Sequence, residues 1–174
     1  MDETIWTIGH STRLIEDFIA LLRANEIETV ADVRRFPGSR WHPQYNERNL
    51  RESLAIEGID YVWIPALGGR RVPLPDSPNS AWRNEAFRGY ADHIATEEFA
   101  EGLFELLMVA GGSRIAIMCS EAVWWRCHRS LISDVLRSIG MRVLHIVNAS
   151  PPSEHEYTAP ARFIGGVLTY ANGN

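Results

Sequence analysis

The residues best suited to chemistry lie together in one short stretch of the sequence, residues 118–129. It holds both cysteines, Cys119 and Cys127, and it adds one carboxylate, one histidine and two arginines: Glu121, His128, Arg126 and Arg129. An apolar run precedes the stretch and a run with helical spacing follows it, so we expect a turn from a strand into a helix. A thiol near a helix N-terminus meets free N–H groups and a positive dipole end, which favour the thiolate. The pattern predicts a reactive thiol at Cys119.

Several kinds of chemistry fit this stretch. As a nucleophile, Cys119 would be activated by the helix dipole and the basic residues after it, while the N–H groups of the turn hold an anion. In this sequence six residues separate Cys119 from the next arginine, Arg126. Cysteine phosphatases and rhodaneses have an arginine closer to the strand-end cysteine. The bulky pair Trp124-Trp125 also departs from their tight loop. This spacing disfavours phosphatase or sulfurtransferase chemistry.

The two cysteines also suggest three other roles. A metal site would take its sulfur and nitrogen ligands from Cys119, Cys127, His128 and His10. Seven residues separate the cysteines, whereas common zinc knuckles have about two to four. A redox pair would join Cys119 and Cys127 in a reversible disulfide. In the simplest interpretation, Cys127 faces the core with Leu131, one helical turn on.

Length and composition favour a single domain. The chain has 174 residues, of which 45% are hydrophobic, enough for one substantial core. Its apolar runs fall short of the ~20 residues that span a bilayer, and the first residues lack a signal-peptide pattern. We therefore expect a cytoplasmic protein without a membrane partner, in which cysteines serve as thiols, ligands or a redox pair.

The basic residues are distributed unevenly. All 17 are arginines, so chemistry that needs a lysine, such as a Schiff base, is excluded. Residues 34–51 contain five arginines and one acid, whereas residues 92–105 contain five acids and no arginine. Phe36, Trp41 and Tyr45 lie among the arginines of the first segment, which suits a surface where bases stack and guanidinium groups meet phosphates. Because the net charge is −5, single strands or nucleotides fit better than duplex DNA.

The elements that must position these residues alternate along the chain. The predicted strands span residues 4–9, 27–33, 59–64, 114–119 and 142–147. The predicted helices span residues 13–24, 46–57, 82–94, 96–110 and the run that ends at 139, with Ser11 or Thr12 as the cap of the first. Alternating strands and helices with apolar strands predict an α/β fold, in which a mostly parallel five-stranded sheet has helices on both faces, a Rossmann-like three-layer arrangement.

In such a sheet, ligands bind at the carboxyl ends of the strands. Residues that are mostly polar or glycine follow each predicted strand there: His10, Ser11, Asp32, Arg34, Gly68, Gly69, Arg70, Cys119, Ser120, Glu121 and Asn148. Each one also has a structural explanation as a cap, a turn or a buried pair. Their convergence predicts a functional site.

Two segments are less defined by pattern. Residues 65–80 form the longest irregular run, which suits a lid, a binding loop or a surface excursion. We expect residues 1–150 to form the α/β domain and residues 151–174 to form a tail that packs on it.

Four groups of motifs resemble the DUF488 family of unknown function. They are Thr7-Ile8-Gly9-His10-Ser11; Asp32-Val33-Arg34 with Pro37 and Ser39; Gly58-Ile59-X-Tyr61 leading to Leu67-Gly68-Gly69; and Cys119-X-Glu121 with Cys127-His128-Arg129 and His145-Ile146. The resemblance runs in order over residues 5–147. It implies a compact α/β domain with a shared site made of these residues, but it implies no reaction or cofactor.

The leading hypothesis is a small enzyme that acts on an anionic, phosphate-bearing substrate, such as a nucleotide or a nucleic-acid component. Its expected catalytic residues are Cys119, Glu121, His128, Asp32 and His10. Its expected substrate-binding residues are Ser11, Arg34, Ser39, Gly68, Gly69, Arg70, Arg126 and Arg129. The competing hypothesis is a non-catalytic module whose arginine- and tryptophan-rich loop binds single-stranded nucleic acid or a partner protein.

Overall fold

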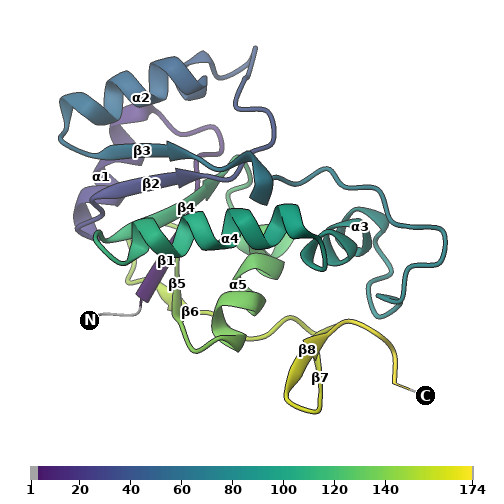
Figure 1. The fold of residues 1–174 in the computed structure, drawn as a ribbon. Coiled ribbons are helices and arrows are strands. Elements are labelled where there is room, and N and C mark those ends of the chain that lie inside the picture. Colours follow the sequence, from purple (N-terminus) through teal and green to yellow (C-terminus); the bar gives the residue numbers. More distant parts are fainter. Residues whose placement is uncertain (1–3, 174) are drawn as a thin grey trace.

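The computed structural model describes residues 4–173 and has three layers, with one sheet between two sets of helices (Figure 1). The strands of the sheet lie in the order β3-β2-β4-β1-β5-β6. Its five parallel strands correspond to the predicted ones: β1 (Thr4–Gly9), β2 (Thr29–Asp32), β3 (Asp60–Trp63), β4 (Ile115–Cys119) and β5 (Arg142–Ile146). The predicted α/β class and mostly parallel sheet are confirmed.

The helices divide between the two faces of the sheet. One face carries α1 (Ile15–Ala24) and α2 (Glu47–Ile56); the other carries α3 (Glu85–Ile94), α4 (Glu97–Ala110) and α5 (Arg129–Ser138). Successive residues of a strand point to opposite faces. Accordingly, Ile117 packs in the cluster with Leu106 and Leu136, while its neighbour Met118 packs in the cluster with Phe18. This alternation buries both faces of the sheet.

Short 3-10 helices connect the larger elements: η1 (Pro43–Tyr45), η2 (Pro65–Leu67) and η3 (Trp124–Arg126). Because η3 follows β4, helix α5 begins only at Arg129. The predicted turn from a strand into a helix over residues 118–129 is confirmed, but it contains η3, so the free N–H groups of α5 lie near Cys127 and not near Cys119. The aromatic pair Trp124-Trp125 forms η3 and lengthens the connection.

The predicted cap of the first helix is wrong. Helix α1 begins after Leu14 and has no side-chain cap. Ser11 does not cap it because the Ser11 N–H is still paired with the carbonyl of Ser120, at 2.9 Å, and Ser11 has a positive φ of 49°. This hydrogen bond continues the pairing of β1 with β4 beyond the last residues of the two strands, Gly9 and Cys119.

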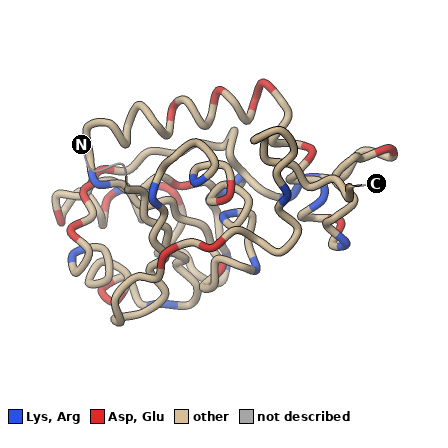
Figure 2. The backbone as a smooth tube through the Cα atoms, turned by 90° about the horizontal axis from the view of Figure 1, so that it is seen from below, with Lys and Arg blue, Asp and Glu red and all other residues tan. Residues whose placement is uncertain are grey.

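The C-terminal tail, from residue 151 to the last described residue, 173, returns to the sheet, although the sequence pattern does not indicate its structure. Strand β6 (Ser153–Glu154) pairs antiparallel with β5, and β7 (Arg162–Ile164) forms a hairpin with β8 (Val167–Thr169) that projects from the body (Figure 1). Beyond the hairpin, Tyr170 is buried in the same cluster as α5. Acidic and basic residues are interspersed along the backbone (Figure 2). Among the described residues, no helix is long and apolar enough to cross a membrane.

Candidate functional site

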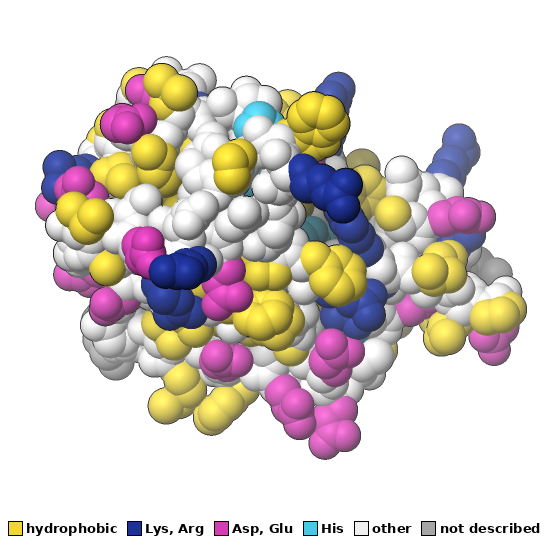
Figure 3. Space-filling view, turned by 90° about the horizontal axis from the view of Figure 1, so that it is seen from above, with side chains coloured by type: hydrophobic (Ala, Val, Ile, Leu, Met, Phe, Trp, Pro, Cys, Tyr) yellow, Lys and Arg dark blue, Asp and Glu magenta, His cyan; other side chains and the backbone are white. Residues whose placement is uncertain are grey.

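A cavity of about 510 Å³ opens at the carboxyl ends of the strands, where the sequence predicts a site. Figure 3 shows basic side chains gathered beside a hollow in the upper face of the molecule. Most of the predicted residues line the cavity: His10, Ser11, Arg34, Ser39, Gly69, Arg70, Cys119, Glu121, Arg126, Cys127 and His128. The structure thus brings together side chains from three strand ends and from the start of α5.

Three predicted residues lie behind the wall of the cavity. Asp32 supports Arg34, Arg129 supports the cysteines, and Gly68 packs against Arg35 so closely that a Cβ atom would lie 2.7 Å from the Arg35 Cα. These residues shape the site without facing it. The lining also includes Ser120, a predicted strand-end residue, and Phe36 from the predicted arginine-rich surface, together with residues that were not predicted: Thr12, Arg35, Gly38, His42, Ala86 and Tyr90. The arginine-rich composition of residues 34–51 is the signal that points to Arg35, Phe36 and His42.

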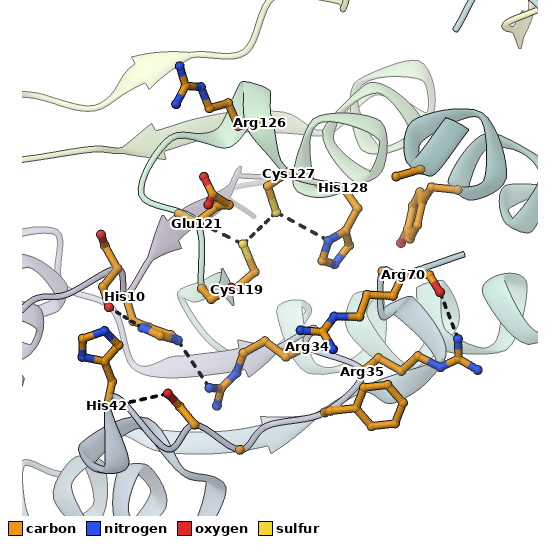
Figure 4. Close-up of a pocket in the computed structure, with 18 of the residues that line it drawn as sticks. His10, Arg34, Arg35, His42, Arg70, Cys119, Glu121, Arg126, Cys127 and His128 are labelled. Carbon is orange, nitrogen blue, oxygen red and sulfur yellow. Dashed lines mark hydrogen bonds between the residues drawn. The ribbon is translucent and has the colours of Figure 1, made fainter. Parts of the chain in front are cut away.

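The two cysteines meet at the floor of the cavity (Figure 4). Both are free cysteines and buried, and their Sγ atoms lie 2.7 Å apart. The guanidinium of Arg129 lies behind them and donates from Nε to Cys119 Sγ at 2.9 Å. The β4 strand end holds one thiol and the start of α5 holds the other, so the fold itself creates the pair.

The surroundings of the two thiols drive their pKa values apart. Burial and the hydrogen bond to Cys127 raise the pKa of Cys119 well above its ordinary value. Burial acts in the same direction on Cys127, but the hydrogen bond from Cys119 and the charges of His128 and Arg129 lower the Cys127 pKa well below its ordinary value. The Arg129 backbone N–H also points at Cys127 Sγ, 3.4 Å away. These surroundings favour Cys127 as the more acidic thiol, while the reactivity of Cys119 stays a prediction.

His128 is oriented by a backbone carbonyl. Its Nε2 lies 3.0 Å from the oxygen of Val33, and its Nδ1 lies 3.5 Å from Cys127 Sγ. Because a carbonyl only accepts, Nε2 carries a proton, and Nδ1 faces the thiol. Gly69 makes room for this ring, since a Cβ atom there would lie 2.8 Å from Nδ1. The imidazole of His128 thus lies between the Cys127 thiol and the Val33 carbonyl, which orients it.

The second predicted acid–base group, His10, is occupied by other contacts. Its Nδ1 donates to the carbonyl of Ser11 at 2.8 Å, and its Nε2 accepts from Arg34 at 3.4 Å. Burial is the main cause that lowers the His10 pKa to about 4, so the ring is neutral near pH 7. The ring stacks on Tyr45, with centroids 4.1 Å apart. These contacts assign His10 to the wall of the cavity.

Asp32 and Arg34 form a buried ion pair. The guanidinium of Arg34 donates to both carboxylate oxygens, with the shortest contact at 2.6 Å, and Tyr61 donates a further hydrogen bond at 2.6 Å. Asp32 is fully buried and Arg34 is 7% exposed. Asp32 is therefore saturated by donors, and most of the charge of Arg34 is already compensated.

Glu121 and Ser39 contribute mainly through their main-chain and local contacts. The Glu121 carbonyl accepts from Arg129, while its exposed carboxylate makes no hydrogen bond within residues 4–173. Ser39 donates its N–H to Asn46 and accepts from the His42 N–H, which fixes the loop that follows β2. Neither side chain reaches the thiols by a hydrogen bond in this structure.

The free positive charges of the cavity lie at its mouth. Arg35 and Arg70 flank the ring of Phe36, with guanidinium carbons 5.5 and 5.9 Å from its centroid. Phe36 is 62% exposed. Arg126 points away from the thiols (Figure 4). Arg70 has a positive φ of 58°, which is uncommon for a residue with a side chain and places it at this rim.

The hypothesised metal site is not formed. Across the described part of the chain, no three His, Cys, Asp or Glu side chains are arranged to hold a metal ion. The physical reason is visible at the cysteines: the guanidinium of Arg129 occupies the space behind both sulfurs and would repel a cation.

The fold and the cavity define a class of protein, a small three-layer α/β domain with a basic, thiol-containing site at the strand ends. The chain belongs to the DUF488 family, described as a domain of unknown function, which it matches over residues 14–136. No curated protein and no solved structure shows a significant match to the chain.

Proposed function

We propose that this protein is a thiol-dependent enzyme that acts on an anionic, phosphate-bearing substrate such as a nucleotide, with Cys127 as the nucleophile. The observation that carries the proposal is the environment of Cys127, a buried thiol with a lowered pKa at the floor of an arginine-lined cavity. Low-pKa thiols beside a histidine and a helix N-terminus are typical of nucleophilic cysteines.

The proposed first step is proton transfer from the Cys127 thiol to Nδ1 of His128. The Val33 carbonyl holds the proton on Nε2, so a second proton on Nδ1 makes an imidazolium beside the thiolate. The thiolate then forms a bond to an electrophilic centre of the substrate, and the leaving group departs with the bonding electron pair and takes the proton from His128. Cys119 donates a hydrogen bond that stabilises the thiolate before attack.

The mouth of the cavity supports an anionic substrate with an aromatic part. The exposed ring of Phe36 offers a stacking surface, and the nearby Arg35 and Arg70 offer donors for phosphate oxygens. A volume of about 510 Å³ falls in the range of small-molecule sites. A nucleoside monophosphate meets each of these requirements.

The test is the rate of Cys127 alkylation by iodoacetamide, resolved by residue with mass spectrometry. We expect Cys127 to react at pH 6 at least about tenfold faster than Cys119, because only the thiolate is nucleophilic. Adenosine monophosphate is expected to protect Cys127. Arg35→Ala and Arg70→Ala should weaken this protection, while Arg48→Ala on the exposed side of α2 should not. Slow alkylation of Cys127 below the pH range of ordinary thiols would refute the proposal.

A second candidate function, dithiol redox chemistry, is favoured by the 2.7 Å separation of the two Sγ atoms. In this reaction Cys127 attacks a substrate disulfide and releases one substrate thiolate. Cys119 then attacks the mixed disulfide, releases the second thiolate and leaves a Cys119–Cys127 disulfide. Cys119→Ser separates the candidates: a redox enzyme would be trapped at the mixed disulfide, whereas a nucleophilic enzyme would turn over.

A further inference from the structure

Arg129 carries a buried positive charge that has no direct carboxylate partner. Its side chain is 1% exposed, and no ion pair joins it to a carboxylate within residues 4–173. Its donors go instead to Cys119 Sγ, to the carbonyl of Glu121 and to Thr7 Oγ1, the last at 3.3 Å. A buried charge normally requires compensation, and the hydrogen bonds that continue from Thr7 lead to a group that can provide it.

A chain of hydrogen bonds leads from Thr7 to a buried carboxylate. Thr7 Oγ1 lies 2.7 Å from His145 Nδ1, and His145 Nε2 lies 2.9 Å from His155 Nδ1. His155 Nε2 lies 2.8 Å from Asp134 Oδ1. All four side chains are at most 1% exposed. The chain therefore runs through the interior, from the back of the thiol pair to the far side of α5.

The two ends of this chain fix the direction of every proton in it when the imidazoles are neutral. The Asp134 carboxylate only accepts, so His155 Nε2 carries a proton and His155 Nδ1 accepts from His145 Nε2. His145 Nδ1 then accepts from the Thr7 hydroxyl, which accepts from the Arg129 guanidinium. Burial is the main cause that lowers the pKa of His145, and the neighbouring His155 and then Arg129 add to it, so this ring is neutral. All the donors point from the cation to the anion.

We infer that Asp134, His155, His145 and Thr7 form a positioning relay that holds the guanidinium of Arg129 against the two cysteines and so sustains the Cys127 thiolate. The inference rests on the proposed function of Cys127. Ordered hydrogen-bond chains in a buried, low-dielectric environment polarise one another. Trp124 covers the relay by stacking on His145, with ring centroids 4.2 Å apart and planes 8° from parallel.

The family match over residues 14–136 contains Asp134. Thr7 and His145 lie outside this range in motifs that resemble the family, and His155 lies in the tail. The other titratable groups that face the thiol pair come from different elements: His128 immediately precedes α5, Arg129 begins α5 and Tyr90 lies on α3. The relay reaches Cys127 only through Arg129, which separates its effect from theirs.

The experiment measures the pH dependence of Cys127 alkylation in relay variants. Thr7→Val removes the hydroxyl next to Arg129, and Asp134→Asn removes the carboxylate at the opposite end. We expect the midpoint of the alkylation profile to rise by about one pH unit in both, which is an approximately tenfold loss of thiolate at lower pH. Thr7→Ser, which retains the hydroxyl, is expected to restore the midpoint.

The matched control is Tyr170→Phe. Tyr170 donates to the other oxygen of Asp134, at 2.9 Å, but does not lie between Asp134 and Arg129. The Tyr170→Phe variant should have a lower melting temperature but an unchanged midpoint of Cys127 alkylation. Unchanged midpoints in folded Thr7→Val and Asp134→Asn would overturn the relay, and Thr7→Val alone decides the matter if Asp134→Asn does not fold. An ordinary thiol pKa at Cys127 in the unmodified protein would instead overturn the proposed function.

Discussion

Two chemically identical side chains acquire different properties here because their neighbours differ. Cys119 ends a buried strand and receives a hydrogen bond from a guanidinium, whereas Cys127 also meets a helix N-terminus and an imidazole. The sequence places both residues in one stretch but does not specify which one the α5 N-terminus faces. That assignment depends on η3, whose single turn moves the start of α5 away from the strand end.

At the residue scale, Gly69 is expected to be essential for the reactivity of Cys127. In Gly69→Ala, the new methyl group would lie 2.8 Å from His128 Nδ1 and would displace the ring from the thiol. We expect the Cys127 alkylation rate at pH 6 to fall by about tenfold, the effect of about one pKa unit. Gly38→Ala is the control, because Gly38 also lines the cavity but has no atom within 4 Å of the added Cβ. Equal rates in the two variants would contradict this role.

At the scale of elements, the pattern of residues predicts the regular structure well and the connections poorly. Strands and helices follow from apolar periodicity, and α4 begins within one residue of its predicted start, Thr96. The failures occur where tertiary contacts decide. Ser11 pairs with Ser120 and does not cap α1, and the turn after Cys119 contains the 3-10 helix η3, which the sequence pattern does not indicate. Local sequence carries no information about such contacts.

The long loop over residues 65–80 shows the same dependence on a distant residue. One carboxylate, Asp92 on α3, accepts hydrogen bonds from the Leu74 N–H, the Ser77 hydroxyl and the Asn79 amide, at 2.5 to 2.8 Å. The loop also crosses Gly89 so closely that a Cβ atom there would lie 2.4 Å from the Arg71 carbonyl oxygen. These contacts favour an anchored loop over a mobile lid.

The anchor gives the loop a pH dependence. Partial burial would raise the Asp92 pKa, but the hydrogen bonds from Ser77, Asn79 and Leu74 lower it overall. A carboxyl with a lowered folded-state pKa stabilises the fold above its unfolded pKa, and this contribution is lost as the pH falls through the lower folded value, below about pH 4. We expect Asp92→Ala to speed hydrogen exchange at residues 72–80 at pH 7 and to remove the acid-dependent change. Exchange as slow as in the unmodified protein would contradict the anchor.

At the scale of the whole molecule, the residues at the strand ends could be predicted from the sequence, but the residues that support them from behind could not. The strand ends carry the predicted residues because parallel strands bring their carboxyl ends together. The support behind the site does not follow from any local pattern. Thr7 and His145 are 138 positions apart, and His155 lies in a tail whose structure the sequence does not indicate. Only the folded sheet, with β6 added to its edge, brings them into one chain of contacts.

Trp41 distinguishes the proposed enzyme from a non-catalytic nucleic-acid module. It is 88% exposed and does not line the cavity. We therefore expect Trp41→Ala to leave the protection of Cys127 by adenosine monophosphate unchanged. Salt-dependent binding of a short single-stranded oligonucleotide, measured by fluorescence anisotropy, provides the comparison. Strong binding that is lost in Trp41→Ala but kept in Cys127→Ser would favour the module, since stacking contributes about 1–3 kcal/mol per base.

The position of β1 has a consequence for biosynthesis. This first strand lies between β4 and β5, both made more than 100 residues later. Contacts of such long range slow folding, because the intervening chain must be ordered before they form. During translation, the hydrogen bond between Thr7 and His145 cannot form until His145 leaves the ribosome, and the one between His145 and His155 forms later still. The cysteines are made earlier, so a nascent chain carries both thiols before the proposed relay can form, and we expect the proposed thiolate to be among the last features of the protein to form.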